Sequence, residues 1–199
     1  MSHQKFCIVD NINNIAWLRN KFHFPDDIVA TPDGFRCAAV VIPFIQLDGK
    51  IHIIFTKRTA TVRDHQNQIS FPGGACEVFD KSELDAALRE LEEEIGIQIP
   101  LESVFGALEA RKTVTGYFIT PFIAFIDSSQ KIRPNPAEVE RVIYVPLKWL
   151  ADPGNCSSRP YSRDGIAVDD VLFFKPFDGE TIWGITAKIL YDLLQEIKK

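Results

Sequence analysis

An acidic, amphipathic helix that follows a glycine turn constrains the fold of this chain more than any other segment. Residues 71–74 read Phe-Pro-Gly-Gly, a turn that no regular element crosses and that lets the backbone approach a ligand closely. Ser82 is placed to cap a helix over residues 82–95, and Gly96 follows its end, where a left-handed backbone is favoured. At about 100° per residue the helix presents one apolar stripe, formed by Leu84, Leu88, Leu91 and Ile95. That stripe must pack on a core.

Three glutamates lie beside this stripe. Glu90, Glu93 and Glu94 are at positions i, i+3 and i+4, whereas Glu92 points to the far side. Like charges one turn apart repel, and only Arg89 is near enough in sequence to offset them. Glutamate-rich helices are usually solvated surfaces, but here the carboxylates adjoin the buried stripe rather than oppose it. Clustered hard oxygen ligands are what Mg²⁺ or Mn²⁺ requires, so this helix is the candidate metal site.

The remaining hydrophobic patterns predict a mixed set of strands and helices. Asp48-Gly49 lies between two β-rich runs and is a strong hairpin signal. The expected strands cover residues 37–47, 51–56, 104–108, 117–126, 139–145 and 167–174, the expected helices about 11–22, 147–150 and about 182–198, and the expected loops 57–70 and 152–163. Strands and helices mix without strict alternation, and no repeat or linker divides the chain. Residues 1–199 are therefore expected to form one α/β or α+β domain with a mixed sheet.

The overall composition excludes several classes of protein. The chain has 199 residues, 46% of them hydrophobic, which is the composition of a folded domain rather than of a disordered segment. With 22 basic and 27 acidic residues, its net charge of −5 argues against a nucleic-acid-binding protein. No apolar run reaches the ~18 residues of a membrane span, and the N-terminus lacks a secretory pattern. The four cysteines, at positions 7, 37, 76 and 156, form no CxxC pair and are spaced too widely for a zinc or disulfide pattern, which favours a cytoplasmic protein with reduced thiols.

The acidic helix carries a resemblance to a known family. Residues 89–97 read Arg-Glu-Leu-Glu-Glu-Glu-Ile-Gly-Ile and match the core of the Nudix box at every defined position. Upstream, Gly74 is followed by five residues and then by Asp80, where the usual box has Glu, and one extra residue separates Asp80 from Arg89. The chain therefore resembles the Nudix hydrolases over roughly residues 35–195, with the box at about 74–97. The resemblance implies a single Nudix hydrolase domain, an α/β/α sandwich with a mixed sheet.

The segment before the helix resembles one branch of this family. Residues 53–59 read Ile-Ile-Phe-Thr-Lys-Arg-Thr and are followed by Arg63 and the Phe-Pro-Gly-Gly turn, an order similar to the signature of the coenzyme A pyrophosphatase-like branch. Further similar segments are residues 113–116, 135–139, 145–147 and 182–187. The resemblance implies metal-dependent hydrolysis of the diphosphate bond of coenzyme A or acyl-coenzyme A, giving 3′,5′-ADP and 4′-phosphopantetheine or its acyl form. Two alternatives stay open: a Nudix diphosphatase for another nucleoside diphosphate derivative (ADP-ribose, NADH or a nucleoside triphosphate), and a non-catalytic domain that senses a nucleotide.

The resemblance also implies roles for particular residues. Glu90 and Glu94 are the expected central ligands of Mg²⁺ or Mn²⁺, and Glu93 shares that task. The expected catalytic residues are Arg89, which orients the glutamates, Glu93, and Glu138, a base or extra ligand in a late loop. The expected substrate-binding residues are Lys57, Arg58, Arg63, Gly73 and Gly74, of which the cations meet phosphate groups. The implied partner is a small nucleotide substrate of the coenzyme A type, with no nucleic acid and no membrane, and a homodimer is left open.

Overall fold

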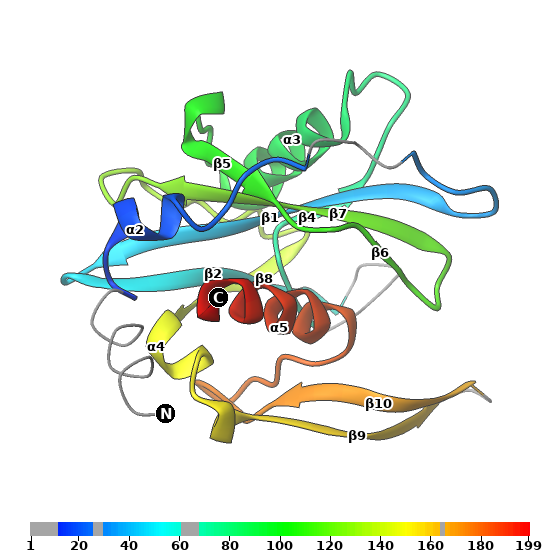
Figure 1. Ribbon diagram of the computed structural model, residues 1–199. Coiled ribbons are helices and arrows are strands. Elements are labelled where there is room, and N and C mark those ends of the chain that lie inside the picture. The colour runs from blue at the N-terminus through cyan, green and yellow to red at the C-terminus, as the bar shows by residue number, and fades with distance from the viewer. Residues whose placement is uncertain (1–11, 26–29, 61–67, 164–165) are drawn as a thin grey trace.

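The computed structural model describes residues 12–25, 30–60, 68–163 and 166–199, and the centre of this described part is a mixed, eight-stranded sheet (Figure 1). β1 (Arg36–Leu47) is the central strand, and it pairs antiparallel with β2 (Lys50–Arg58) and β4 (Gly73–Ala75) and parallel with β7 (Tyr117–Ile126). The other strands extend from these: β3 (Ile69–Ser70) and β8 (Val139–Pro146) pair with β2, and β5 (Val104–Ala107) and β6 (Arg111–Lys112) pair with β7.

The hairpin between β1 and β2 forms at the predicted turn. Leu47 pairs with Lys50, so the loop has two residues, and Asp48 and Gly49 have φ values of 49° and 73°. Two successive positive φ angles are the geometry that favours Asp-Gly in a tight hairpin. β2 then continues through Arg58, beyond the predicted end of the strand, because it pairs with β8 from His52 to Arg58.

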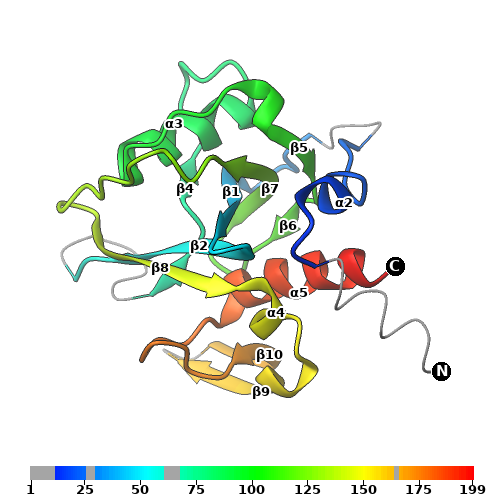
Figure 2. The ribbon, with the colours of Figure 1, turned by 90° about the vertical axis from the view of Figure 1, so that its left-hand side faces the viewer.

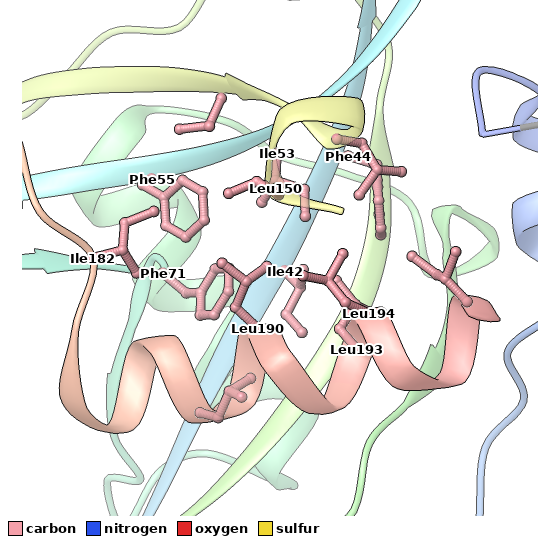
Figure 3. Packing of buried hydrophobic residues seen from close by; sticks show 14 of the residues in the cluster. Ile42, Phe44, Ile53, Phe55, Phe71, Leu150, Ile182, Leu190, Leu193 and Leu194 are labelled. Atoms are coloured by element: carbon pink, nitrogen blue, oxygen red, sulfur yellow. The ribbon is translucent and has the colours of Figure 1, made fainter. Parts of the chain in front are cut away.

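Helices cover both faces of the sheet, as the predicted α/β/α sandwich requires. α3 (Glu83–Ile95) lies on one face, and α5 (Gly184–Lys198) lies on the other beside α4 (Leu147–Leu150) (Figure 1). Side chains of β1 alternate between the two layers, because successive strand residues point to opposite faces. Val41 and Ile45 belong to the core under α3, whereas Ile42 and Phe44 belong to the core under α5. In Figure 3 the α5 layer is closed by the labelled leucines Leu190, Leu193 and Leu194.

Some elements differ from the sequence prediction. The segment expected to be a loop at residues 152–163 contains β9 (Cys156–Arg163), which forms an antiparallel hairpin with β10 (Ile166–Phe174) apart from the main sheet (Figure 2). The helix expected at about 11–22 is α2 (Ile15–Arg19), which starts where the Asn14 side chain accepts a hydrogen bond from the Trp17 amide. The described residues also form the short helices η1 (Leu101–Ser103) and η2 (Pro153–Asn155). Within the described ranges, no helix has both the length and the apolar character needed to cross a membrane.

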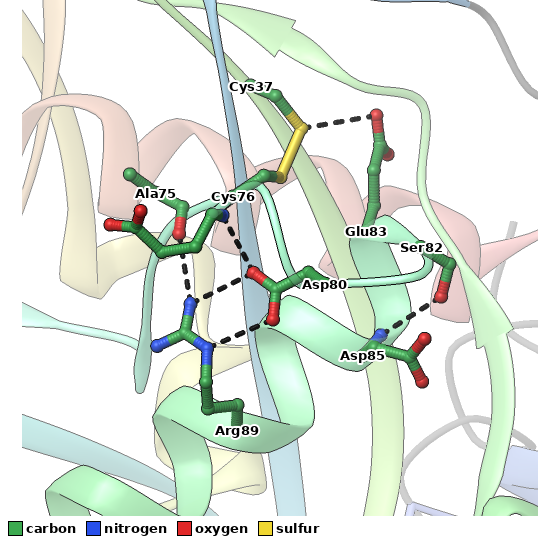
Figure 4. The surroundings of a disulfide bond; sticks show 9 residues. Cys37, Ala75, Cys76, Asp80, Ser82, Glu83, Asp85 and Arg89 are labelled. Carbon is green, nitrogen blue, oxygen red and sulfur yellow. Dashed lines mark hydrogen bonds and ion pairs between the residues drawn. A yellow bond between two sulfur atoms is a disulfide. The ribbon is translucent and has the colours of Figure 1, made fainter.

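The prediction that the cysteines form no disulfide is wrong. β1 and β4 are paired so that Ala38 lies opposite Ala75, which places the next two residues, Cys37 and Cys76, with Cα atoms 5.4 Å apart and their sulfurs bonded (Figure 4). The two cysteines are 39 positions apart in sequence, and only the long-range strand pairing brings them together. Cys156 is free and half-buried.

Candidate active site

The two glycines of the turn form β4 and lie directly against the acidic helix. Gly73 has a φ of 152°, and a Cβ atom there would lie 2.6 Å from the Cα of Val40. A Cβ on Gly74 would lie 2.5 Å from the Glu90 carboxyl carbon. Any larger residue would displace either β1 or this carboxylate. The glycines therefore let one strand of backbone run between the sheet and the glutamates.

Helix α3 is capped at both ends as the sequence predicts. The Ser82 Oγ accepts a hydrogen bond from the Asp85 amide at 3.1 Å, and Gly96 ends the helix with a φ of 68°. Leu91 and Ile95 of the predicted stripe are fully buried, while Leu84 and Leu88 pack partly buried at its edge. These contacts fix the rotation of the helix, and so they fix where its carboxylates point.

Arg89 is the centre of a network that joins the glycine turn to the helix. Its Nε and Nη2 donate to the two oxygens of Asp80, at 3.0 and 3.1 Å, and Nη2 also donates to the Ala75 carbonyl at 3.1 Å (Figure 4). Nη1 donates to Glu90 at 2.7 Å and to Glu93 at 3.0 Å. A bidentate arginine–carboxylate pair is geometrically specific. The Arg89 guanidinium holds the pKa of Asp80 below its usual range, and it is itself held charged.

Glu94 is a buried carboxylate in contact with β2. Its side chain is 1% exposed, and it accepts hydrogen bonds from Thr56 Oγ1 at 3.1 Å and from Arg58 Nη1 at 3.3 Å. Burial raises the pKa of Glu94 to about 7, although Arg58 and Thr56 favour its charged form, and the negative charges of Glu90 and Glu138 raise it further. Burial also raises the pKa of Glu90, against the effect of Arg89.

Glu138 is brought to these carboxylates by the loop that contains it. The amides of Arg133 and Asn135 donate to the last carbonyls of α3, those of Ile95 and Glu94, both at 2.8 Å. The Glu138 amide then donates to the Asn135 carbonyl at 3.1 Å. Because the loop is fastened to the end of the helix, the charge of Glu138 acts on both Glu90 and Glu94. The structure thus places Glu90 and Arg89 against the glycine turn and Glu93 on Arg89, and it brings Glu138 close enough to Glu90 and Glu94 for their charges to interact.

The three expected phosphate-binding cations are placed differently from one another. Arg58 contacts Glu94, and in the described part of the chain its Nε is buried without a hydrogen-bond partner. Lys57 forms ion pairs with Glu140 at 2.9 Å and with Glu180 at 3.0 Å, and the hydrogen bond to Glu140 is the main cause that raises the pKa of Lys57. Arg63 lies outside the described residues.

Thr56 is a site residue that the sequence reasoning did not single out. It is fully buried and donates to the carboxylate of Glu94. The signal was available, because Thr56 is the threonine of the Thr-Lys-Arg run in the upstream signature. The Ala75 carbonyl, which holds Arg89, carries no side-chain signal at all.

The chemistry of the donor set fits a divalent cation. Glu90 and Glu94 are desolvated carboxylates. The negative charges of Glu93 and Glu138 raise the pKa of Glu90, those of Glu90 and Glu138 raise the pKa of Glu94, and a hard cation would relieve this repulsion. Among the described residues no three acidic, histidine or cysteine side chains already converge at metal-ligand spacing. Arg58 instead forms an ion pair with Glu94, and Arg89 forms one with Glu90.

Comparison with known proteins identifies the family. Residues 35–164 match the family described as the NUDIX domain, and the chain belongs to this family. It is 34% identical over 166 residues to the uncharacterized Nudix hydrolase NudL of Photorhabdus laumondii, which covers 83% of this chain and 87% of the relative. It is 30% identical over 177 residues to the protein of the same description in Yersinia pestis, with 87% of each chain covered. The chain is a Nudix hydrolase, an enzyme of the pyrophosphatase class.

The same fold occurs in a solved structure with low sequence identity. A MutT/nudix family protein from Enterococcus faecalis superposes with a TM-score of 0.58 at 14% identity, covering 100% of this chain and 73% of that chain. At this identity the similarity concerns the fold alone. It agrees with the mixed sheet between two helical layers described above.

Proposed function

We propose that this enzyme hydrolyses the diphosphate bond of coenzyme A or acyl-coenzyme A, releasing 3′,5′-ADP and 4′-phosphopantetheine or its acyl form. The observation that carries the hydrolytic part is the network in which Arg89 donates to Glu90 and Glu93, with Glu90 against the backbone of Gly74 and Glu94 one turn further along the same helix. The preference for coenzyme A rests on the resemblance of the upstream segment, in which Thr56 and Arg58 both contact Glu94. Water attacks one phosphorus of the diphosphate, the bond from that phosphorus to the bridging oxygen breaks, and each product leaves with one of the two phosphate groups as a monoester.

Mg²⁺ or Mn²⁺ is the proposed cofactor, with Glu90 and Glu94 as its main ligands and Glu93 as a further one. Such an ion, when bound, supplies positive charge for the diphosphate oxygens and lowers the pKa of a water molecule. Arg89 orients Glu90 and Glu93, because it donates to both from one nitrogen. Glu138 is the proposed base that receives the proton of the attacking water, since it stands next to these carboxylates without being on their helix.

The substrate is proposed to lie along the glycine turn. The backbone of Gly73 and Gly74 runs against the carboxylates, so a phosphate bound there would be close to them. Arg58 and Arg63 are the proposed cations for the phosphate groups, and Lys57 shares this role only if the substrate competes with Glu140 and Glu180. A small-molecule nucleotide substrate and a cytoplasmic location are parts of the proposal that derive from the sequence, and a homodimer is left open.

The test is turnover of coenzyme A with Mg²⁺ or Mn²⁺, followed by chromatographic identification of the products. Appearance of 3′,5′-ADP and 4′-phosphopantetheine in equal amounts is the expected result. ADP-ribose, NADH and a nucleoside triphosphate are assayed in parallel at the same metal concentration. If any of these compounds were hydrolysed faster than coenzyme A, that compound would become the proposed substrate, and the enzyme would still be a Nudix hydrolase. No turnover of any of them would support a nucleotide-sensing domain instead.

A further inference from the structure

We infer that Cys37 and Cys76 are a reversible thiol–disulfide pair that controls how firmly the catalytic glycine turn is held. The effect on catalysis rests on the proposed function, but the existence and reversibility of the disulfide do not. The pair is formed by two residues on neighbouring strands, with Cα atoms 5.4 Å apart. The Cys76 amide also donates to the Cys37 carbonyl at 3.0 Å, so the two residues are held side by side by the backbone as well.

The disulfide is one residue away from the arginine network. Cys76 follows Ala75, whose carbonyl accepts from Arg89 Nη2, and it precedes Glu77, whose amide donates to Asp80 at 2.7 Å (Figure 4). Residues 75–77 therefore form backbone hydrogen bonds with both members of the Arg89–Asp80 pair. Gly74, two residues before Cys76, lies against Glu90. The crosslink anchors this short segment to the central strand β1.

The anchor matters because β4 has only three residues. Without the disulfide, the turn is attached to β1 through a few backbone contacts, and such short edge segments open readily on their own. A covalent link between residues 39 positions apart restricts this opening. In the oxidised enzyme the Ala75 carbonyl and the Gly74 backbone should thus stay in place more of the time, and the carboxylates that depend on Arg89 should bind metal more tightly.

Cys37 and Cys76 are both half-buried rather than fully enclosed, so we expect a small thiol to reach the pair. In the reductive direction, one thiolate of a dithiol attacks one sulfur of the pair, forms a mixed disulfide and releases the other cysteine as a thiolate, which takes up a proton. The second thiol of the reductant then attacks the mixed disulfide and frees the remaining cysteine. Two electrons pass from the dithiol to the protein, and the reductant leaves as its cyclic disulfide. In the opposite direction, a small-molecule disulfide such as oxidised glutathione accepts the two electrons and leaves as two thiols. In a cytoplasmic protein a disulfide of this kind is generally transient and regulatory rather than structural.

The experiment compares the purified enzyme after treatment with oxidised glutathione and after treatment with dithiothreitol. Thiol titration and peptide mapping should show a Cys37–Cys76 crosslink after oxidation and its loss after reduction. The oxidised enzyme should need at least about threefold less Mn²⁺ for half-maximal turnover of coenzyme A, and the amides of residues 74–80 should exchange more slowly with deuterium. The double variant Cys37→Ser/Cys76→Ser should behave like the reduced enzyme under both treatments. Cys156→Ser, which changes the free cysteine on β9, is the matched control and should respond like the wild type.

Three results would overturn the inference: no crosslink between these two residues, a crosslink that dithiothreitol does not open, or equal Mn²⁺ requirement and equal exchange in both states. Failure of the proposed function is recognised separately. If coenzyme A is not hydrolysed, the peptide map and the exchange rates of residues 74–80 still report on the pair, and unchanged exchange then decides against it.

Discussion

At the scale of single residues, Glu94 has an ionisable carboxyl group that is almost completely buried. Burial raises its pKa from an ordinary value of 4.5 to about 7. Between these two pH values the folded chain binds a proton at Glu94 that the unfolded chain has already lost. The contribution of Glu94 to the free energy of unfolding is therefore greatest below pH 4.5 and is lost as the pH rises through about 7.

The first prediction follows from this sign. In the presence of a chelator, the free energy of unfolding should fall by up to about 3 kcal/mol between about pH 5 and pH 8. Urea titrations across this range measure the change. Glu94→Gln carries no titrating proton there, so most of the fall should be absent in that variant, with a smaller remainder from Glu90, whose pKa is raised in the same direction. An identical pH dependence in both proteins would contradict the assignment of the shift to Glu94.

A second prediction concerns turnover. Glu90→Gln and Glu94→Gln should each lower kcat by at least ~100-fold, because each removes a charge whose interaction is strongest with the charged transition state. Glu92→Gln is the control, since Glu92 is exposed on the same helix and its carboxylate accepts a hydrogen bond from the Gln98 side chain. Circular dichroism should show an unchanged fold in all three variants. Wild-type rates for both Glu90→Gln and Glu94→Gln, with metal present, would show that these two carboxylates do not take part in catalysis.

At the scale of secondary-structure elements, β4 and α3 act as one unit, because the Gly74 backbone and the Glu90 carboxylate occupy adjoining space. Gly74→Ala would place a methyl group 2.5 Å from the Glu90 carboxyl carbon, so that carboxylate must move. We expect kcat/KM to fall by roughly tenfold or more, since small displacements of positioned groups are costly to catalysis. Gly154→Ala, in η2, is the comparison, because a methyl group there meets only the Asp152 side chain at 3.2 Å. Steady-state kinetics of both variants decide the point: equal effects would indicate a general loss of stability.

The secondary-structure elements show which features of the fold local sequence signals can predict. Helix α3 and the β1–β2 hairpin could be predicted, because a serine cap, a terminal glycine and an Asp-Gly turn act within a few residues of where they stand. β4 could not, since Gly73 and Gly74 are poor strand formers and are extended only by their pairing with β1. The disulfide was missed for the same reason.

The candidate site also has one part that could be predicted from the sequence and one part that could not. The carboxylates of one helix face follow from its periodicity, and the box identifies them. The contact of Thr56 and Arg58 with Glu94 depends on β2 continuing past its hydrophobic run, which its pairing with β8 makes possible. The approach of Glu138 depends on hydrogen bonds to the end of α3 that no sequence pattern marks.

At the scale of the whole molecule, the sheet separates the candidate site from the hydrophobic core under α5. Phe71, just before the glycines, stacks on Phe55 with ring centroids 4.8 Å apart in the layer under α5 (Figure 3). Phe71, at the start of the glycine turn, therefore packs on the face opposite the acidic helix. The glycines that follow cross to the carboxylates. Substrate recognition must then come from groups around this turn and from the segment before it.

Choice of substrate is the property that depends on this larger arrangement. Lys57 and Arg58 are both engaged with carboxylates, by Glu140 and Glu180 in one case and by Glu94 in the other. Of the three cations of the upstream signature, Arg63 is thus the one that we assign to the 3′-phosphate of coenzyme A, a group remote from the bond that is cleaved. Dephospho-coenzyme A, which lacks this phosphate, should be hydrolysed with a kcat/KM roughly tenfold lower, about 1.4 kcal/mol, because a charge-assisted contact is lost.

Combining the substrate with a variant sharpens this last prediction. Arg63→Ala should lower kcat/KM for coenzyme A by about tenfold and leave dephospho-coenzyme A nearly unchanged, because the two changes remove the same contact. Lys57→Ala is the parallel variant, and we expect it to reduce both substrates alike, since its partners are protein carboxylates. The measurement is kcat/KM of the wild type and both variants with each of the two substrates, at one Mn²⁺ concentration. If Arg63→Ala weakened both substrates equally, Arg63 would instead act on the cleaved diphosphate, which every Nudix substrate shares, and the selection of coenzyme A would have to come from its pantetheine arm.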